Sequence, residues 1–75
     1  MKREKAFRNK EILMDTRQAA EMLKISPKTL ERMRVEGRGP AFVKVGRCVR
    51  YRESDILAFI ERNIFESTSE FVANR

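Results

Sequence analysis

The sequence contains no histidine and no tryptophan, a single cysteine, and only three glycines and two prolines among its 75 residues. One cysteine excludes an internal disulfide, and one cysteine without histidine cannot complete a zinc site. The common pairing of a nucleophile with a histidine base is also missing. No apolar run approaches the roughly 20 residues that cross a bilayer, and the charged first residues are not followed by a signal-peptide core. We therefore expect a cytoplasmic protein that is not an enzyme and uses no metal or cofactor.

Charge is what the chain has in quantity. Charged residues make up 37% of the sequence, the formal net charge is +6, and the 41% of hydrophobic residues suffice for one small core. A small and strongly basic domain is expected to bind a polyanion, with nucleic acid as the leading candidate. The alternative is that the charge only favours solubility. Between Glu36 and Glu53 every charged residue is basic, and acids predominate afterwards, which indicates one face for the polyanion and another for solvent or a partner.

Residues 26–37 have the pattern of one short helix. Ser26 suits the N-cap position, Pro27 suits the first helical position, and Gly37 can adopt the left-handed conformation that ends a helix. Leu30 and Met33 lie on one face of this helix. The residues that are left to point elsewhere are Lys28, Thr29, Arg32 and Arg34. A helix with so small an apolar face and such a basic outer face is typical of one that reads the DNA major groove.

A first helix is predicted just before this one. Asp15 and Gln18 have the spacing of a capping box, and the apolar run 12–14 precedes them. Ala19, Ala20, Met22 and Leu23 follow at helical spacing. With residues 24–25 as a turn, the two segments form a helix-turn-helix pattern.

Residues 41–52 predict a β-hairpin that turns at Gly46 and Arg47. The alternation within each strand places one set of side chains toward the helices: Val43, Val45, Val49 and Tyr51. It places the other set toward water or phosphate: Lys44, Arg47, Arg50 and Arg52. A third helix is expected to start near residues 53–55 and to close the core with Ile56, Phe59, Ile60 and Ile64.

The chain divides into three parts. Residues 1–11 form a basic arm, which is either a flexible terminus or a segment that follows a minor groove. Residues 12–64 form the folded domain. Residues 65–75 form a polar tail that is either frayed or ordered by a partner.

From residue 12 to residue 62 the sequence resembles the MerR-like winged helix-turn-helix of the excisionase and AlpA-type DNA-binding proteins. The segments that carry the resemblance are residues 18–20, 25–30, Gly37 and Pro40, 45–47, 49–52, 54–56 and 59–60. It implies a mostly α-helical fold with a small β-hairpin wing, a second helix in the major groove, and a wing along the neighbouring minor groove or backbone. Two residues depart from the pattern: Met33 stands where an aromatic is common, and Cys48 where a basic residue is common.

The predicted DNA contacts combine the second helix with the wing. They are Lys28, Thr29, Arg32, Arg34, Lys44, Arg47 and Arg50. The resemblance implies one of two roles: an excisionase, that is, a recombination directionality factor that bends repeated sites and promotes integrase-mediated excision of a mobile element, or an AlpA-like transcriptional regulator of such an element. The implied partners are double-stranded DNA, a site-specific integrase, and further copies of the chain on DNA, joined through the third helix or the tail. A basic protein-interaction or antitoxin-like module is the alternative from a different class.

Overall fold

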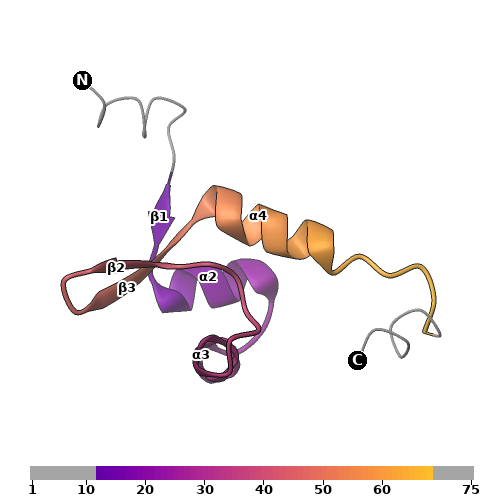
Figure 1. Ribbon diagram of the computed structural model, residues 1–75, viewed down its shortest axis with the longest axis horizontal. Helices are drawn as coiled ribbons and strands as arrows, with labels where there is room; N and C mark the ends of the chain where they lie inside the picture. The colour runs from indigo at the N-terminus through magenta and orange to yellow at the C-terminus, as the bar shows by residue number, and fades with distance from the viewer. Residues whose placement is uncertain (1–11, 69–75) are drawn as a thin grey trace.

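The computed structural model describes residues 12–68 (Figure 1), so the predicted arm and the last seven residues of the predicted tail lie outside the described part. Three helices and a small three-stranded antiparallel sheet make up this part. In chain order the elements are β1 (Leu13–Met14), α2 (Thr16–Leu23), α3 (Pro27–Val35), β2 (Val43–Val45), β3 (Cys48–Arg52) and α4 (Glu53–Arg62). This is the winged helix-turn-helix architecture that the sequence predicted.

The helix pair forms through the predicted caps. The Asp15 carboxylate accepts the Gln18 N–H at 2.8 Å, and the Gln18 amide oxygen accepts the Asp15 N–H at 2.9 Å, which completes the capping box. Lys24 ends α2 in the left-handed conformation, with φ at 61°. Ser26 then caps α3 by accepting the Thr29 N–H at 3.1 Å. These local interactions set the direction of each helix before any tertiary packing is considered.

The sheet has the order β1–β3–β2. β1 was not predicted as a strand, because two residues are too few to show an alternating pattern. Leu13 pairs with Arg52 and Met14 with Tyr51, so β3 becomes the central strand. The start of the domain is thereby joined to the strand that leads directly into α4.

The pairing of β2 with β3 corrects the predicted faces of the hairpin. The paired residues are Val43 with Arg50, Lys44 with Val49, and Val45 with Cys48. Residues opposite each other in an antiparallel pair share a face. Val49 and Tyr51 therefore share the helix-covered face with Lys44, not with the two valines of β2. Val45 is accordingly 53% exposed, and the prediction that it packs on the helices is wrong.

The error came from using the alternation within each strand without the pairing that the predicted two-residue turn imposes. The two turn residues are Gly46, whose φ is 63°, and Arg47, whose φ is not positive. The predicted type II′ turn requires this combination, with a positive φ at its first residue only. A two-residue turn pairs positions 45 and 48, so an odd number in one strand faces an even number in the other. Alternation within each strand cannot reveal this parity. The basic residues of the wing consequently occupy both of its faces instead of one.

The core lies between the three helices and β3. It consists of Ala19, Ala20, Leu30, Tyr51 and Ile56, each at most 1% exposed. Ile64 was expected to help close this core, but it is 60% exposed. α4 ends at Arg62, so Ile64 lies beyond the helix and cannot continue its apolar stripe.

The start of α4 is held by an ion pair rather than by a capping side chain. Arg52 donates from Nε to Asp55 Oδ2 at 2.7 Å and from Nη2 to Oδ1 at 2.9 Å. Arg52 was predicted to face water or phosphate, whereas its guanidinium binds this carboxylate. The hydrogen bonds from Arg52 lower the pKa of Asp55 below its ordinary value of 3.8.

Replacing Asp55 with asparagine is expected to lower the free energy of unfolding at pH 7 by about 0.5 kcal/mol, because the pair is partly exposed. A lowered folded-state pKa stabilises the fold above the unfolded value, and this stabilisation is lost as the pH falls through the folded-state pKa. Urea unfolding at pH 7 and pH 2.5 measures the effect, with Glu61→Gln on the exposed side of α4 as the control. An equal difference between wild type and D55N at both pH values would exclude this role for the carboxylate.

Candidate nucleic-acid interface

The outward face of α3 forms the first half of the candidate interface. Figure 1 shows α3 end-on at the lower edge of the molecule, on the side away from β1 and α4. Leu30 points inward and is fully buried. The opposite face lines a shallow depression, formed by Lys28, Glu31, Arg32, Val35 and Glu36. A protruding helix with an exposed, charged face has the shape that a major groove admits.

Two of the predicted contacts, Lys28 and Arg32, lie together on this face and are exposed. They are one helical turn apart, so both side chains can reach the same stretch of a groove. Glu31 lies between them, which makes the face mixed in charge rather than wholly basic. The carboxylate of Glu36 is paired with Arg38, whose Nε lies 2.6 Å from Oε1. Glu31 has two possible roles: its carboxylate can pair with a neighbouring basic side chain, or it can accept from a cytosine amino group.

Val35 belongs to the same face and was not among the predicted site residues. It lines the depression with Lys28 and Arg32, and it is 82% exposed. Its position seven residues after Lys28 is the signal that could have found it, because residues i and i+7 share a helix face. An apolar side chain there can contact the methyl group of a thymine.

Thr29 is occupied by the cap of its own helix. Its hydroxyl lies 2.8 Å from the hydroxyl of Ser26, and its backbone N–H donates to the same Ser26 oxygen. Its side chain is only partly exposed. A DNA contact by Thr29 stays a prediction, and the geometry gives the residue a structural role at the start of α3.

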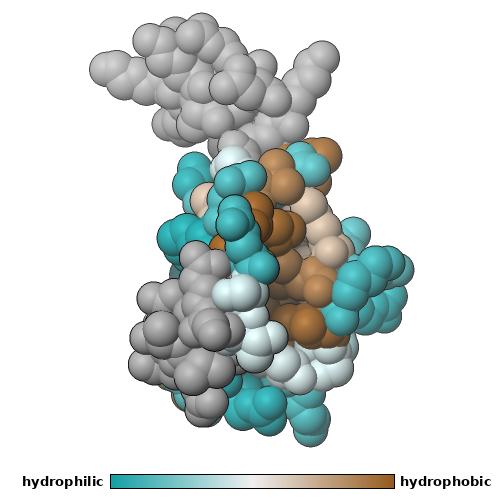
Figure 2. Space-filling model, turned by 90° about the vertical axis from the view of Figure 1, so that its right-hand side faces the viewer, coloured by the Kyte–Doolittle hydropathy of each residue, from teal (hydrophilic) through white to brown (hydrophobic). Residues whose placement is uncertain are grey.

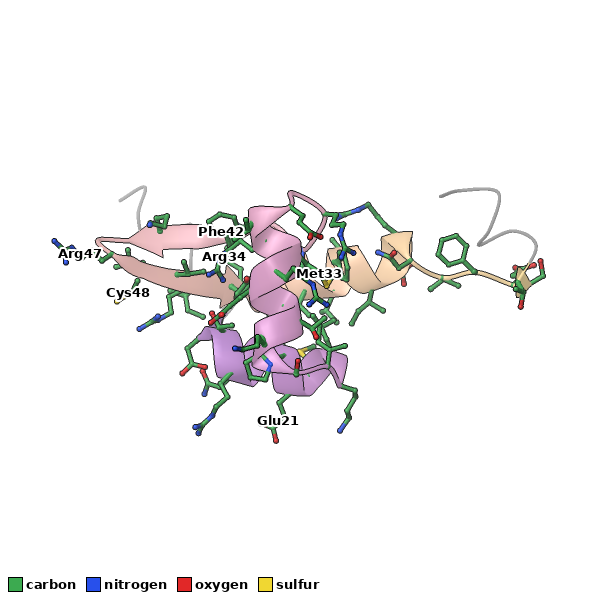
Figure 3. All side chains as sticks on the ribbon, turned by 90° about the horizontal axis from the view of Figure 1, so that it is seen from below. Glu21, Met33, Arg34, Phe42, Arg47 and Cys48 are labelled. Atoms are coloured by element: carbon green, nitrogen blue, oxygen red, sulfur yellow. The ribbon has the colours of Figure 1, made fainter. Side chains whose placement is uncertain are left out.

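Arg34 does not extend outward with the other basic residues of α3. Its Nη1 donates to the Tyr51 hydroxyl at 3.1 Å, and its guanidinium carbon lies 5.8 Å from the centre of the Phe42 ring. Figure 3 shows Arg34 and Phe42 together where α3 meets the base of the hairpin. The structure thus brings Arg34 to the wing, while Lys28 and Arg32 stay on the outward face.

The wing forms the second half of the interface. Arg47 lies at the tip of the hairpin and is exposed, and Figure 3 shows it pointing away from the body of the domain. Lys44 is also exposed, on the face of the sheet that the helices cover. Arg50 lies on the opposite face and is half-buried, with its Nη1 donating to the Val49 carbonyl at 2.8 Å. Of the three, Arg47 is the residue best placed to contact a phosphate.

Comparison with known families agrees with this geometry. A family model described as a helix-turn-helix domain matches residues 13–64, which is more than half of the chain. A search of curated proteins finds no match. The chain therefore belongs to this helix-turn-helix domain family, which includes the excisionase and AlpA-type DNA-binding domains. Its partner is DNA.

Over residues 12–68, no helix has the length and apolar character of a membrane-crossing segment. In that stretch of the chain, histidine, cysteine and carboxylate side chains form no group of three able to hold a metal ion. Cys48 is exposed and carries a free thiol.

Replacing Arg47 with alanine is expected to weaken binding to every DNA sequence and to reduce the slope of log affinity against log salt by about 1. The reason is that a phosphate contact carries no sequence information but releases counterions. A salt-titrated binding isotherm measures the slope, with Arg62→Ala on the opposite end of the molecule as the matched control. A slope that stays at the wild-type value in R47A would remove Arg47 from the interface.

Proposed function

We propose that this protein is an excisionase, a recombination directionality factor of a mobile genetic element. It binds repeated sites beside the attachment region, bends the DNA there and helps a site-specific integrase to excise the element. It works in the cytoplasm, bound to the nucleoid. Family membership supports DNA binding, and the family includes excisionase-type domains.

The observation that carries the proposal is the joint placement of two DNA-binding elements. α3 exposes Lys28 and Arg32, and the wing carries Arg47 at its tip. A helix in the major groove together with a wing on the adjacent backbone covers roughly one turn of DNA. One module of this size gives limited selectivity, so an architectural role requires several copies on adjacent sites.

Assembly on adjacent sites needs a surface away from the DNA. α4 lies on the side of the molecule opposite the wing tip, and Figure 2 shows apolar surface on that side. Leu57 and Ile60 of α4 are 48% and 37% exposed, and Ile64 just beyond the helix is 60% exposed. Contacts between copies through α4 or through the tail would give cooperative filling of neighbouring sites. An integrase is the second partner that this surface can accept.

The test is selection of the fragments that the protein binds from genomic DNA of its source, followed by isotherms on DNA with one and with several copies of the best site. The excisionase role predicts enrichment of repeated sites at an integrase attachment region, cooperative filling, and bending in a circular-permutation gel assay. Enrichment at a promoter would instead favour an AlpA-like regulator of the element. Weak, salt-sensitive binding to all DNA alike would contradict sequence recognition and leave a basic protein-interaction or antitoxin-like module.

A further inference from the structure

A polar and aromatic cluster joins the recognition helix to the wing. It consists of Arg34 in the last turn of α3, Phe42 just before β2, and Tyr51 in the central strand β3. Arg34 donates to the Tyr51 hydroxyl at 3.1 Å and lies 5.8 Å from the Phe42 ring centre. The two rings are themselves in contact, with centres 6.3 Å apart and planes inclined by 55°. Each member therefore contacts both of the others.

The chain between the helix and the wing is shaped to bring this cluster together. Gly37 reverses the chain after α3 with φ at 74°. Gly39 then passes so close to α3 that an added Cβ would lie 3.3 Å from the Cβ of Met33 and 3.7 Å from the Arg34 nitrogen. This close approach returns the chain alongside the last turn of α3 and places Phe42 beside the Arg34 side chain.

The cluster matters because α3 has little other direct contact with the strands. Within residues 12–68, α3 packs chiefly on α2, while the sheet packs on α2 and α4. The angle between α3 and the wing would otherwise be set only indirectly, through α2 and the loop. A charged hydrogen bond combined with a guanidinium over an aromatic ring is a directional link of the kind that can hold such an angle.

We propose that Arg34 is a positioning residue that sets the angle between the recognition helix and the wing. The inference rests on the proposed DNA-binding function and adds to it a residue that acts on the wing without itself reading DNA. A fixed angle lets α3 and Arg47 engage one DNA segment together, because the second contact then forms without a further ordering cost. Loss of the cluster leaves both elements intact but uncouples them.

Tyr51 makes the proposal testable, because its side chain is fully buried and cannot touch DNA. Tyr51→Phe removes the hydroxyl and keeps the ring, and Arg34→Gln removes the guanidinium. Both variants are expected to weaken binding to a single specific site about three- to tenfold. In an Arg47→Ala background both effects should shrink to less than twofold, because the wing contact that they position is already gone. Arg34→Lys, which keeps the charge but not the planar fork, should behave like Arg34→Gln.

A direct DNA contact by Arg34 predicts different results, and these would overturn the proposal. Tyr51→Phe would bind as the wild type does, Arg34→Lys would restore affinity, and the loss in Arg34→Gln would be the same with and without Arg47. Correct folding of each variant is checked by circular dichroism and thermal unfolding.

A second readout does not depend on DNA. Residual dipolar couplings of the free protein report the orientation of α3 relative to β2 and β3, and Arg34→Gln is expected to change or broaden that orientation. An unchanged orientation would overturn the positioning role even where DNA binding is confirmed. A wild-type protein that binds no DNA, with an orientation that shifts in Arg34→Gln, would contradict the proposed function and leave the role of Arg34 in the fold supported.

Discussion

Replacing Leu30 with alanine is expected to lower the free energy of unfolding by about 2–5 kcal/mol and the melting temperature by at least about 10 °C. Leu30 is fully buried on the inner face of α3, in a hydrophobic core that comprises five residues within the described range 12–68. The substitution removes apolar contacts and leaves a cavity that so small a core cannot fill. A domain of this length is stable by only about 3–9 kcal/mol, so L30A would populate the unfolded state measurably at 25 °C.

Urea unfolding followed by circular dichroism measures the loss. Val35→Ala is the matched control, since it truncates another aliphatic residue of the same helix that is 82% exposed. V35A should change stability by less than about 0.5 kcal/mol, because it creates no cavity and alanine favours the helix. Similar losses in both variants would mean that α3 is not anchored through Leu30.

Replacing Arg32 with alanine is expected to reduce affinity for the specific site about 5- to 150-fold while changing affinity for random DNA much less. Arg32 is exposed at the middle of the outward face of α3, next to Lys28 and Glu31. An arginine in the major groove donates two hydrogen bonds to guanine, and a pair of this kind discriminates by about 1–3 kcal/mol. The loss should therefore appear as reduced selectivity rather than as a uniform weakening.

Isotherms on the selected site and on shuffled DNA at one salt concentration measure the two losses together. Arg38→Ala is the control, since Arg38 is also an exposed arginine close to α3, but it lies outside the helix and pairs with Glu36. Equal losses on both DNAs in R32A would assign Arg32 to phosphate contact. The contrast with R47A, where equal losses are expected, separates base readout by α3 from backbone contact by the wing.

The local signals of the sequence were sufficient for the helices. Asp15 caps α2 and Ser26 caps α3, as the sequence predicted, and Gly37 has the predicted left-handed conformation. These features depend on residues within three or four positions of one another, so spacing alone reveals them. The predicted burial of Leu30 and Ile56 was confirmed for the same reason, since both belong to helical stripes.

The sheet required more than local spacing. The first strand, the parity of the hairpin and the exposure of Val45 all depend on which residues pair across the sheet. A change of one position in that pairing moves every side chain of a strand to the other face. The sequence of either strand taken alone does not contain that choice.

The residues of the candidate site also divide into those that local spacing predicts and those that only tertiary contacts place. Lys28 and Arg32 were found from the sequence because a helix face follows from periodicity, and Arg47 because a two-residue turn exposes its residues. Arg34 was grouped with them as a basic residue of the same helix, although it follows the buried Leu30 by four residues and so lies toward the inner side of α3. Only the tertiary structure turned it toward Tyr51, because the path of the chain through Gly39 and the register of β3 bring that hydroxyl within its reach. The sequence by itself thus determined the second helix of the pair and the basic wing tip, and the fold decided which basic side chains stay exposed and which one links the helix to the strands.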